Sequence, residues 1–540
     1  MRSPRVTKPL RVLQTHVVLR HGDRTPTYNC MEPMGERAVI ESFAWARKLP
    51  RRAELATLHS EFDVVRPDGA PPRDRDLGVF GSLTRRGLAQ TRALGRSLRG
   101  VYGAVDRADC VVYSSNFTRT VRSAQSMLGG FLDLATARAE DAEAAEAAAP
   151  LRINVTSDAN DHINVYAHVP GLARRMAAIV NDPEHHSGVH AAEQAMAPLT
   201  RALESAIPCY AMFIKSFSWI GAADHFYCRE MRRDAVAGGY RDAHAAVDAE
   251  DDGVTNAHVE ALFHEIDNDA DGAISLEELR GVLDVVCARR VSDGDALRVY
   301  RSMLGEDGEA AGAGASGGDA LPPLRLSHFA AFVRRGLPAI PADDLARVAA
   351  AASAAGDAVA SLGDRMDPRR HAGATPPGMD AIVGVAMSHL CRRFHAWYCD
   401  DETLRLAVGR MMRLVTHSFE ARIAASAGAG AGCVGGKYGH AAPFIVHSGH
   451  DVSVAPVLAS LSARGWDPYA GDVWPGYASA VRLELVCDDG EAEGVGAREG
   501  EATVTRAGRG QLDVDAAQVS FLLFTVTFYA NHANNLTRSP

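Results

Sequence analysis

Short apolar runs at both ends of the chain predict strands, and the middle third follows a helical pattern. The strand candidates are residues 13–19, 110–113, 151–155, 444–446, 480–486 and 519–529. Apolar runs of this length, bounded by turn residues, are typical of buried strands. We therefore expect an α/β fold with a mixed central sheet that is discontinuous in sequence. Helices should flank the sheet, and helical material should be inserted between its two halves.

Segments rich in alanine, glycine and acidic residues separate these elements. They comprise residues 139–149, 309–319, 349–360, 424–436 and 488–510. Stretches of such low complexity are typical of flexible connections. We expect surface loops at all of them, with residues 139–149 either helical or disordered.

The composition is that of an ordinary soluble globular protein. Of the 540 residues, 47% are hydrophobic and 23% are charged, and this length leaves room for about two to four domains. The net charge of −10 argues against nucleic acid as the main partner. No apolar stretch is long enough to span a bilayer, the basic N-terminus lacks an apolar signal core, and the nine cysteines are scattered. We expect a reduced, cytoplasmic protein.

The most informative stretch follows the first predicted strand and reads Arg20-His21-Gly22-Asp23-Arg24-Thr25-Pro26. Gly22 and Pro26 predict a turn, and glycine lets the backbone approach a ligand closely. Arginine suits multidentate capture of a phosphate and stays charged at any working pH. The neighbouring charges should lower the pKa of His21 and keep it neutral and nucleophilic. The stretch therefore predicts attack by a histidine on a phosphoryl group.

Two further segments have the same setting, a predicted strand followed by a predicted helix. His450 and Asp451 follow the apolar run at 443–446, and at a strand end they can supply a phosphate contact and a proton donor. Arg119 opens a helical pattern after the strand at 110–113, where the helix N-terminus also favours an anion. On this segment alone, Arg119 and Arg122 are equally well interpreted as solvated helix charges.

Taken together, these segments resemble the histidine acid phosphatase family, in the branch with an RHGxRxP signature and a later His-Asp pair. The resemblance covers residues 20–26, Arg119, His450 and Asp451, and it extends to a Leu-Thr-x-x-Gly element at residues 83–87. Within the family, residues 87–102, 126–131 and 474–484 look closest to lysophosphatidic-acid-type acid phosphatases. The chain departs from the family pattern at Tyr113, where an arginine is usual.

The resemblance implies a histidine phosphatase core of the phosphoglycerate-mutase-like kind, with a helical cap. It implies that His21 is the nucleophile that becomes phosphohistidine and that Asp451 protonates the leaving alcohol. The phosphoryl oxygens would be held by Arg20, Arg24, Arg119 and His450. Preplaced cations meet the developing charge, so catalysis requires no metal. The implied substrate is a small phosphate ester, such as a lysophospholipid or a sugar or inositol phosphate.

A twelve-residue acidic loop in the middle of the chain fits the EF-hand pattern. The expected Ca²⁺ ligands are Asp267, Asp269, Asp271, the Ala273 carbonyl, Ser275 and Glu278. Apolar residues recur at helical spacing on both sides of the loop, up to Ile266 and from Leu279 onward. The sequence therefore predicts a calcium site with a structural or regulatory role.

A degenerate second EF-hand follows the first. Leu297, Tyr300 and Leu304 predict its first helix, and residues 324–329 match the end of a loop. The loop between them is overlong, and His328 stands where the closing glutamate should be, so we expect this half to hold no metal. We expect a discontinuous core (residues 10–180 and 435–540), a helical cap (181–248 and 376–434) and an EF-hand pair (249–340).

Two other functions stay open. The chain could be a calcium sensor whose phosphatase-like domain is inactive, although the intact His21, Arg20, Arg24 and Asp451 argue against this. It could also be an inositol-polyphosphate phosphatase, which shares the motif but predicts more lysine and arginine around the pocket mouth. Because the calcium loop interrupts the cap segment, we also raise the hypothesis that calcium changes the cap over the active site.

Two other clusters are interpreted as structural. His185, His186 and His190 lie in a polar loop with no acid or cysteine to complete a metal site. Cys391, His395 and Cys399 lie four apart on a predicted helix beside aromatic residues, which favours buried packing in the cap.

Overall fold

The computed structural model describes most, but not all, of the 540-residue chain. The described residues are 10–27, 42, 45–46, 48–74, 78–134, 149–157, 160–169, 171–181, 187–206, 219–230, 260, 263–264, 266–286, 291–305, 321–334, 342–361, 379–426, 441–461, 474–488 and 523–529. The loop predicted at residues 309–319 lies outside them, as do most of the segments 139–149 and 488–510.

The core is a seven-stranded mixed sheet in the order β2-β4-β3-β7-β1-β8-β9. Its strands are β1 (Leu10–Arg20), β2 (Phe62–Val65), β3 (Cys110–Ser114), β4 (Leu151–Val155), β7 (Phe444–Gly449), β8 (Ala480–Asp488) and β9 (Leu523–Tyr529). The first five in the sheet order run parallel, β8 is antiparallel to β1, and β9 is antiparallel to β8. The prediction of a mixed sheet built from both ends of the chain is confirmed. β2 is a strand that the apolar pattern did not reveal.

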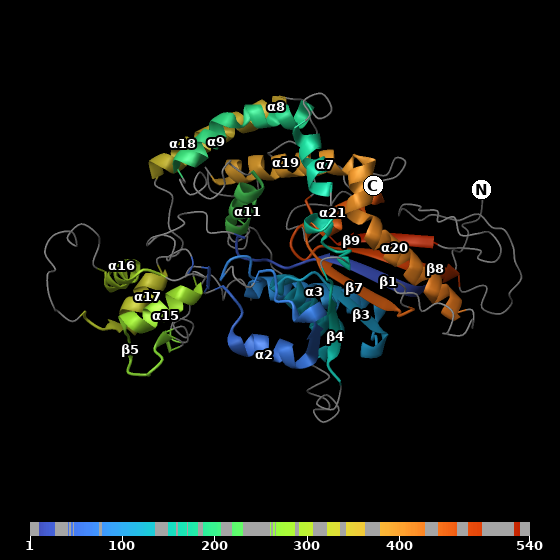
Figure 1. Ribbon diagram of the computed structural model, residues 1–540, viewed down its shortest axis with the longest axis horizontal. Coiled ribbons are helices and arrows are strands. Elements are labelled where there is room, and N and C mark those ends of the chain that lie inside the picture. The colour runs from blue at the N-terminus through green and yellow to red at the C-terminus, as the bar shows by residue number, and fades with distance from the viewer. Residues whose placement is uncertain are drawn as a thin grey trace, which may run out of the picture.

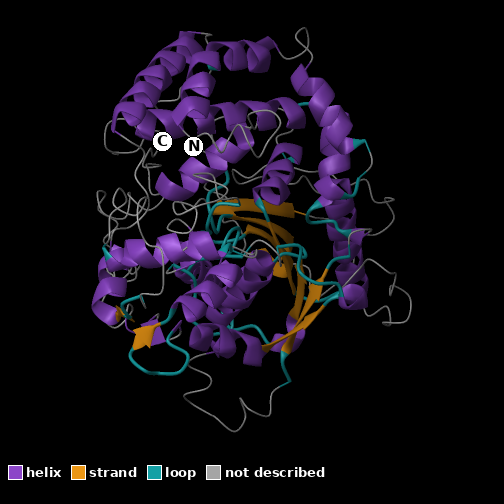
Figure 2. Cartoon of the chain, turned by 60° about the vertical axis from the view of Figure 1, so that its left-hand side comes forward, coloured by secondary structure: helices purple, strands orange, loops and turns teal. Residues whose placement is uncertain are grey.

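Helices flank the sheet and continue into a layer beyond it (Figures 1 and 2). They are α2 (Arg52–Glu61), α3 (Arg85–Tyr102), α4 (Thr118–Phe131), α7 (Leu172–Asn181), α8 (Ser187–Ala195), α9 (Ala197–Ala206), α11 (Trp219–Glu230), α15 (Leu276–Val286), α16 (Asp293–Leu304), α17 (Leu326–Arg334), α18 (Ala342–Ser361), α19 (Met379–Tyr398), α20 (Asp401–Ser426) and α21 (Asp451–Ser460). In the described part of the chain, no helix is both long and apolar enough to cross a membrane.

The central strand β1 is covered on both faces. Val17 and Leu19 pack in an apolar cluster with residues of α3 and α4. Val18 packs in a second cluster with residues of α19, α20 and α21. Successive side chains of a strand point to opposite faces, so a strand buried on both faces reads as a continuous apolar run. This explains the apolar run that precedes Arg20.

A helical layer that contains α8, α9, α18 and α19 lies beyond the sheet, and α11 lies between this layer and the sheet (Figure 1). The prediction of a loop at residues 349–360 is wrong, because these residues lie in α18. Alanine has the highest helix propensity. Val348, Ala352 and Ala355 are buried at helical spacing, which gives α18 an apolar stripe. The Ala-rich composition therefore favoured a helix rather than a flexible connection.

A smaller lobe holds α15, α16 and α17 (left in Figure 1). Two short strands, β5 (Ala273–Ile274) and β6 (Leu324–Arg325), pair antiparallel within it. The lobe has an apolar cluster of its own, in which Phe263, Ile274 and Phe329 are buried. The helices predicted around residues 279–286, 297–304 and 329–333 are therefore present as α15, α16 and α17. The boundaries of the three predicted domains stay predictions.

Candidate active site

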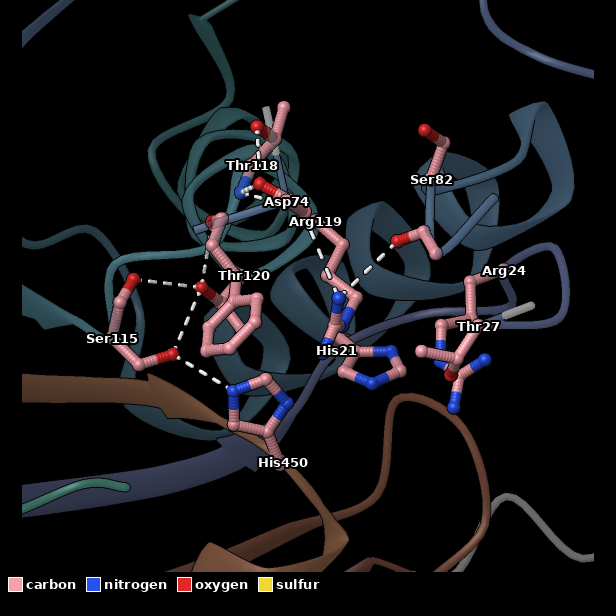
Figure 3. A network of polar contacts seen from close by, with 12 residues as sticks. His21, Arg24, Thr27, Asp74, Ser82, Ser115, Thr118, Arg119, Thr120 and His450 are labelled. Carbon is pink, nitrogen blue, oxygen red and sulfur yellow. Dashed lines mark hydrogen bonds and ion pairs between the residues drawn. The ribbon is translucent and has the colours of Figure 1, made fainter. Parts of the chain in front are cut away.

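The three predicted segments meet at the carboxyl edge of the sheet. Arg20 at the end of β1 lies beside Gly449 at the end of β7, and β3 pairs with the other side of β7. His21 and His450 come directly after these strand ends, and their ring centroids are 5.5 Å apart. Figure 3 shows both imidazoles with the first turn of α4. The structure thus brings together all six residues predicted for the phosphatase site, which are Arg20, His21, Arg24, Arg119, His450 and Asp451.

Two glycines allow the loop after β1 to cross the start of α3 in backbone contact. A Cβ atom at Gly22 would lie 2.2 Å from the carbonyl oxygen of Gly87, so only glycine fits there. Side chains hold the crossing in place. The backbone N–H of Asp23 donates to Gln90 Oε1 (2.8 Å), and the Thr84 hydroxyl donates to the Asp23 carboxylate. The Leu-Thr-x-x-Gly element is therefore the platform that positions the histidine loop.

His21 is buried, and one of its ring nitrogens is already engaged. Its Nδ1 lies 2.8 Å from the carbonyl oxygen of Gly22, which can only accept, so Nδ1 carries the proton and Nε2 has the free lone pair. Burial lowers the pKa of His21 well below its ordinary value, and the charges of Arg119, Arg24 and Arg20 lower it further. The imidazole of His21 therefore stays neutral at a more acidic pH than an exposed histidine would. A nucleophilic imidazole must be neutral, because attack uses the lone pair of a ring nitrogen.

The arginines around His21 carry donors that nothing in the described part of the chain accepts. The Nε atoms of Arg20, Arg24 and Arg119 are buried and have no hydrogen-bond partner there. Buried donors are almost always paired in folded proteins, so these N–H groups are available to an anion that binds in the site. Burial and the charge of Arg24 lower the pKa of Arg119 to about 10. This repulsion between cations would be relieved by a phosphate.

Each of these arginines also pairs with one carboxylate. The pairs are Arg20 with Asp451 (Nη2–Oδ2, 3.0 Å), Arg119 with Asp74 (Nη1–Oδ2, 3.8 Å) and Arg24 with both carboxylate oxygens of Asp224. Ion pairs of this kind fix the plane of a guanidinium. The site is therefore built from matched charges that orient the cations before a substrate binds.

The carboxylates of Asp74, Asp224 and Asp451 differ in the other hydrogen bonds that they accept. Asp74 accepts hydrogen bonds from the backbone and the hydroxyl of Thr118, and Asp224 does the same with Thr27. Asp451 is the first residue of α21, and apart from Arg20 its partner in the described structure is the backbone N–H of the following residue (2.8 Å). Asp451 therefore accepts the fewest hydrogen bonds of the three carboxylates in the described structure.

His450 is held by residues of the β3–α4 connection. Its Nε2 lies 3.0 Å from Ser115 Oγ (Figure 3). Its ring meets the ring of Phe117 edge to face, with centroids 4.9 Å apart. Burial and the charge of Arg119 lower the pKa of His450 well below its ordinary value. Like His21, this imidazole is neutral, and its ring orientation is fixed by a hydroxyl that the sequence analysis did not single out.

Helix α11 contributes residues that the sequence did not connect with the site. Asp224, Tyr227 and Cys228 share one face of this helix. Burial raises the pKa of Asp224, but the charge and hydrogen bonds of Arg24 and the bonds from Thr27 outweigh it, so the pKa lies below its ordinary value. Asp224 is therefore ionised and positions Arg24. The i, i+3, i+4 spacing was the available signal, but no motif linked it to the arginines.

Aromatic rings line the site beside Arg20. The guanidinium carbon of Arg20 lies 4.4 Å from the ring centroid of Tyr477, 6.0 Å from that of Trp474 and 5.9 Å from that of Tyr227. Tyr477 also lies 5.7 Å from the His21 ring, centroid to centroid. Cation–π contacts of this kind stabilise a desolvated guanidinium. These rings therefore surround the guanidinium that is bonded to Asp451, the candidate proton donor.

Three more imidazoles are bonded in a row inside the core. His447 Nε2 lies 3.0 Å from His16 Nδ1, and His447 Nδ1 lies 3.0 Å from His162 Nε2. All three side chains are buried. Burial lowers the pKa of His162 to about 4. This row did not stand out in the sequence, because its members are far apart along the chain.

The residues predicted to bind calcium lie in the smaller lobe, away from this site in the fold. Carboxylate oxygens within 4.8 Å of one another come from Asp267, Asp269 and Asp271. Glu278 folds back over the loop, where its carboxylate accepts hydrogen bonds from the backbone N–H of Asn268 (2.7 Å) and of Ser275 (2.8 Å). Gly272 makes the turn with φ of +83°. The loop therefore presents several hard oxygen donors to one point.

The clusters interpreted as structural have mixed outcomes. His185 and His186 lie outside the described residues, and His190 bonds to Gln194 on the same helix (3.0 Å). Cys391 is buried in α19, as the packing interpretation requires. That interpretation is wrong for Cys399, which is exposed just after the helix ends.

Comparison with known proteins gives a family match for the first third of the chain. Residues 11–182 match the model of the histidine phosphatase superfamily (branch 2). This segment contains His21, the Leu-Thr-x-x-Gly element and Arg119. Together with the mixed sheet flanked by helices, the match gives the protein the histidine phosphatase fold. No curated protein matches the chain.

Solved structures of inositol phosphate phosphatases are distantly similar. The multiple inositol polyphosphate phosphatase of Bifidobacterium longum, in complex with inositol hexasulfate, is 13% identical over 91% of this chain and 86% of that chain, with a TM-score of 0.35. The phytase of Klebsiella sp ASR1 is 14% identical over 90% of this chain and 82% of that chain, with a TM-score of 0.32. The phytase from Citrobacter braakii is 12% identical over 88% of this chain and 82% of that chain, with a TM-score of 0.32.

Proposed function

We propose that the protein is a phosphomonoesterase that works through a phosphohistidine at His21. The observation that carries this proposal is the set of three unpaired, buried arginine N–H groups around a neutral imidazole. A phosphoryl group there would accept hydrogen bonds from Arg20, Arg24 and Arg119 while Nε2 of His21 faces the phosphorus. Such preplaced donors stabilise the charge of a transferring phosphoryl group.

The reaction has two steps. The lone pair of His21 Nε2 attacks phosphorus, the bond from phosphorus to the ester oxygen breaks, and Asp451 gives its proton to the leaving alcohol. Water then attacks the phosphohistidine, Asp451 takes the water proton, and phosphate leaves with His21 neutral again. Throughout, the Nδ1–H of His21 stays bonded to the Gly22 carbonyl, which stabilises the positive ring of the intermediate. A rate that climbs steadily from pH 5 to 8 would count against Asp451 as the donor.

The surroundings of Asp451 favour substrates with an apolar leaving group. Tyr227, Trp474 and Tyr477 lie beside Arg20, the residue bonded to Asp451, so the leaving alcohol departs past aromatic rings. An aliphatic or aryl alcohol packs against such a wall, whereas a polyphosphorylated inositol needs several additional cations. We therefore favour lysophospholipid-type monoesters over inositol polyphosphates. The ratio of kcat/KM for lysophosphatidic acid and inositol hexakisphosphate tests this choice.

The first test is hydrolysis of an aryl phosphate at pH 5, without divalent metal, by the parent protein and by His21→Ala. The proposal predicts turnover by the parent and none by the variant, because His21 is the nucleophile of the scheme and the neighbouring imidazole of His450 is already bonded to Ser115. If neither protein shows turnover across pH, with chelator or with calcium, the phosphatase-like domain is inactive. The calcium-sensor alternative would then be favoured.

We also propose that the loop at residues 267–278 binds Ca²⁺. The donor set fits this ion, because hard oxygens converge on one point and Glu278 closes the loop from the first turn of α15. The pairing of β5 with β6 supports an EF-hand pair, since each short strand belongs to one of the two predicted loops. Catalysis at His21 needs no metal in this scheme.

A contact on α15 supports a regulatory role for this ion. Val282 packs against the apolar cluster of the lobe and also against a cluster that contains Cys228 and Tyr477. Cys228 Sγ lies 3.8 Å from an Arg24 nitrogen, and Tyr477 borders His21. We propose that calcium, by fixing the start of α15, changes the position of Val282 and so the packing behind Arg24.

A further inference from the structure

Helix α4 has two polar faces, and only one of them faces His21. Arg119 and Ser123 lie one turn apart on that face, where Ser123 Oγ accepts a hydrogen bond from the backbone N–H of Gly22 (3.1 Å). Thr118, Arg122 and Gln125 follow the spacing i, i+4, i+7 and share a different face of the same helix. This second face lines a cavity that the phosphatase reaction does not use.

The cavity lies among α4, α2 and β2 and has a volume of about 300 Å³. Small-molecule sites in proteins span about 300 to 1,000 Å³, so there is room for a small ligand. The apolar part of the wall includes Phe62, Val64 and Val121. The polar part includes His59, Arg66, Arg122 and Gln125. This combination suits a ligand with one charged end and an apolar body.

Gln125 is the clearest sign that a ligand belongs there. Its side chain is 1% exposed, yet neither its Oε1 nor its Nε2 has a hydrogen-bond partner in the described part of the structure. The Nε of Arg66 is likewise buried and unpartnered among the described residues. Gln125 and Arg66 both line the cavity, and because buried polar groups are almost always hydrogen-bonded, their unpaired groups point to a missing partner. A ligand in the cavity must therefore accept hydrogen bonds from the amide of Gln125 and from the guanidinium of Arg66.

The charges in this region leave the cavity positive. Burial lowers the pKa of Arg122 and of Arg66, while the nearby carboxylate of Asp74 opposes the shift in both. Asp74 accepts hydrogen bonds from Thr118 and pairs with Arg119 on the other face of α4. One carboxylate is thus shared by three arginines. An anion in the cavity would supply the missing negative charge.

We propose that this cavity is a second ligand site, which binds a small organic acid with an apolar body. Its carboxylate pairs with Arg66 and Arg122 and accepts a hydrogen bond from the Gln125 amide. The hydrocarbon part packs against Phe62, Val64 and Val121. The site is separate from the phosphatase site, because α4 stands between the two and turns Arg119 toward His21. Inorganic phosphate has no apolar body and would therefore favour the phosphatase site.

Calorimetric titration of the full-length protein with octanoate tests this proposal. Inorganic phosphate is kept at saturating concentration, so the arginines around His21 are occupied. We expect one octanoate per chain, and the uncharged octanamide should bind at least about tenfold more weakly, because it cannot pair with the arginines. Arg122→Gln and Gln125→Leu should each weaken octanoate binding about tenfold. Arg96→Gln, which removes an exposed charge on α3, should leave binding unchanged.

Thermal unfolding without octanoate shows whether the variants fold, and Gln125→Leu should fold well because it removes an unpaired buried amide. The proposal is overturned if folded protein binds no octanoate in the presence of phosphate, or if octanamide binds equally well. It is also overturned if both pocket variants bind as tightly as the parent. The experiment does not use hydrolysis as a readout, so its result is independent of the proposed phosphatase activity.

Discussion

The phosphatase site and the acidic loop are built in opposite ways. The loop takes all its proposed ligands from twelve consecutive residues, 267–278, and three of the six, Asp269, Asp271 and Ser275, are exposed. The phosphatase site takes residues from positions as distant as Arg20 and Asp451, and its histidines and arginines are buried. The geometry of the contiguous loop is set by the spacing of residues that are close together in the sequence. The dispersed phosphatase site forms only when the whole sheet has folded. The two sites should therefore respond differently to mutation, acid and metal.

Burial explains why the dispersed site is the more sensitive of the two. In a buried place each charge interacts strongly with its neighbours, as the lowered pKa of His21 and of Arg119 indicates. Around an exposed loop, water screens the same charges. Single substitutions at the phosphatase site should therefore have large effects on rate, and substitutions in the loop small ones.

The largest effect is expected from Arg119→Ala. This change removes a buried donor that faces the transferring phosphoryl group, so kcat for an aryl phosphate at pH 5 should fall by about 10³-fold. The matched control is Arg96→Ala, an exposed arginine on α3, which should keep kcat within about twofold. A loss of less than about tenfold in Arg119→Ala would show that this arginine does not stabilise the transition state.

Acid should destabilise the core through its buried imidazoles. The pKa of His162 is about 4 in the folded protein, below the ordinary value of 6.5, so the unfolded chain takes up the proton first as the pH falls. Above pH 6.5 the protonation of His162 does not affect the free energy of unfolding. As the pH falls from 6.5 to about 4, protonation of the unfolded chain lowers the free energy of unfolding by up to about 3 kcal/mol. Thermal unfolding at pH 7, 5.5 and 4 should therefore show a steeper loss in the parent than in His162→Gln. Parallel curves would contradict the assignment.

Asp224→Asn should have a smaller effect, because Asp224 acts through Arg24. Loss of a charged hydrogen-bond partner costs about 2 kcal/mol, which lowers kcat/KM by about 30-fold. Asp224→Glu should recover part of the loss, since it restores the negative charge. The shape of the pH–rate profile should not change in either variant, in contrast to Asp451→Asn, which removes the acid itself. A shifted profile in Asp224→Asn would mean that Asp224 exchanges a proton during turnover.

The smallest effect is expected from calcium. Coupling between two sites is commonly worth 1–3 kcal/mol, and for a single apolar contact such as Val282 we expect about a fivefold change in kcat/KM between calcium and chelator. Glu278→Gln should weaken calcium binding, measured by calorimetry, and should remove this response. Identical kcat and KM with calcium and with chelator would leave the ion a stabiliser of the lobe. No calcium binding by the parent would contradict the site itself.

The outcome of the sequence analysis follows the same division between local and dispersed features. Strands buried on both faces, such as β1, were predictable because a continuous apolar run leaves few alternatives. The convergence of the six predicted residues could be predicted because their motifs lie at or just after strand ends. Asp224 could not be predicted, because its role depends on how α11 is placed over the sheet. The helix α18 was missed because an Ala-rich segment suits a helix and a low-complexity loop equally well in composition.

The central claim is that His21 carries the phosphoryl group, and trapping the intermediate tests it most directly. The protein is mixed with an aryl phosphate at pH 5, quenched in base within milliseconds, digested, and analysed by mass spectrometry without acid, because phosphohistidine is labile in acid. We predict a phosphate on the imidazole of His21, in the peptide that contains this residue. The amount of phosphopeptide should be larger in Asp451→Asn than in the parent, because this variant lacks the base that assists the attack of water. Steady turnover by the parent with no phosphate on this peptide, or with phosphate on a different residue, would contradict the account.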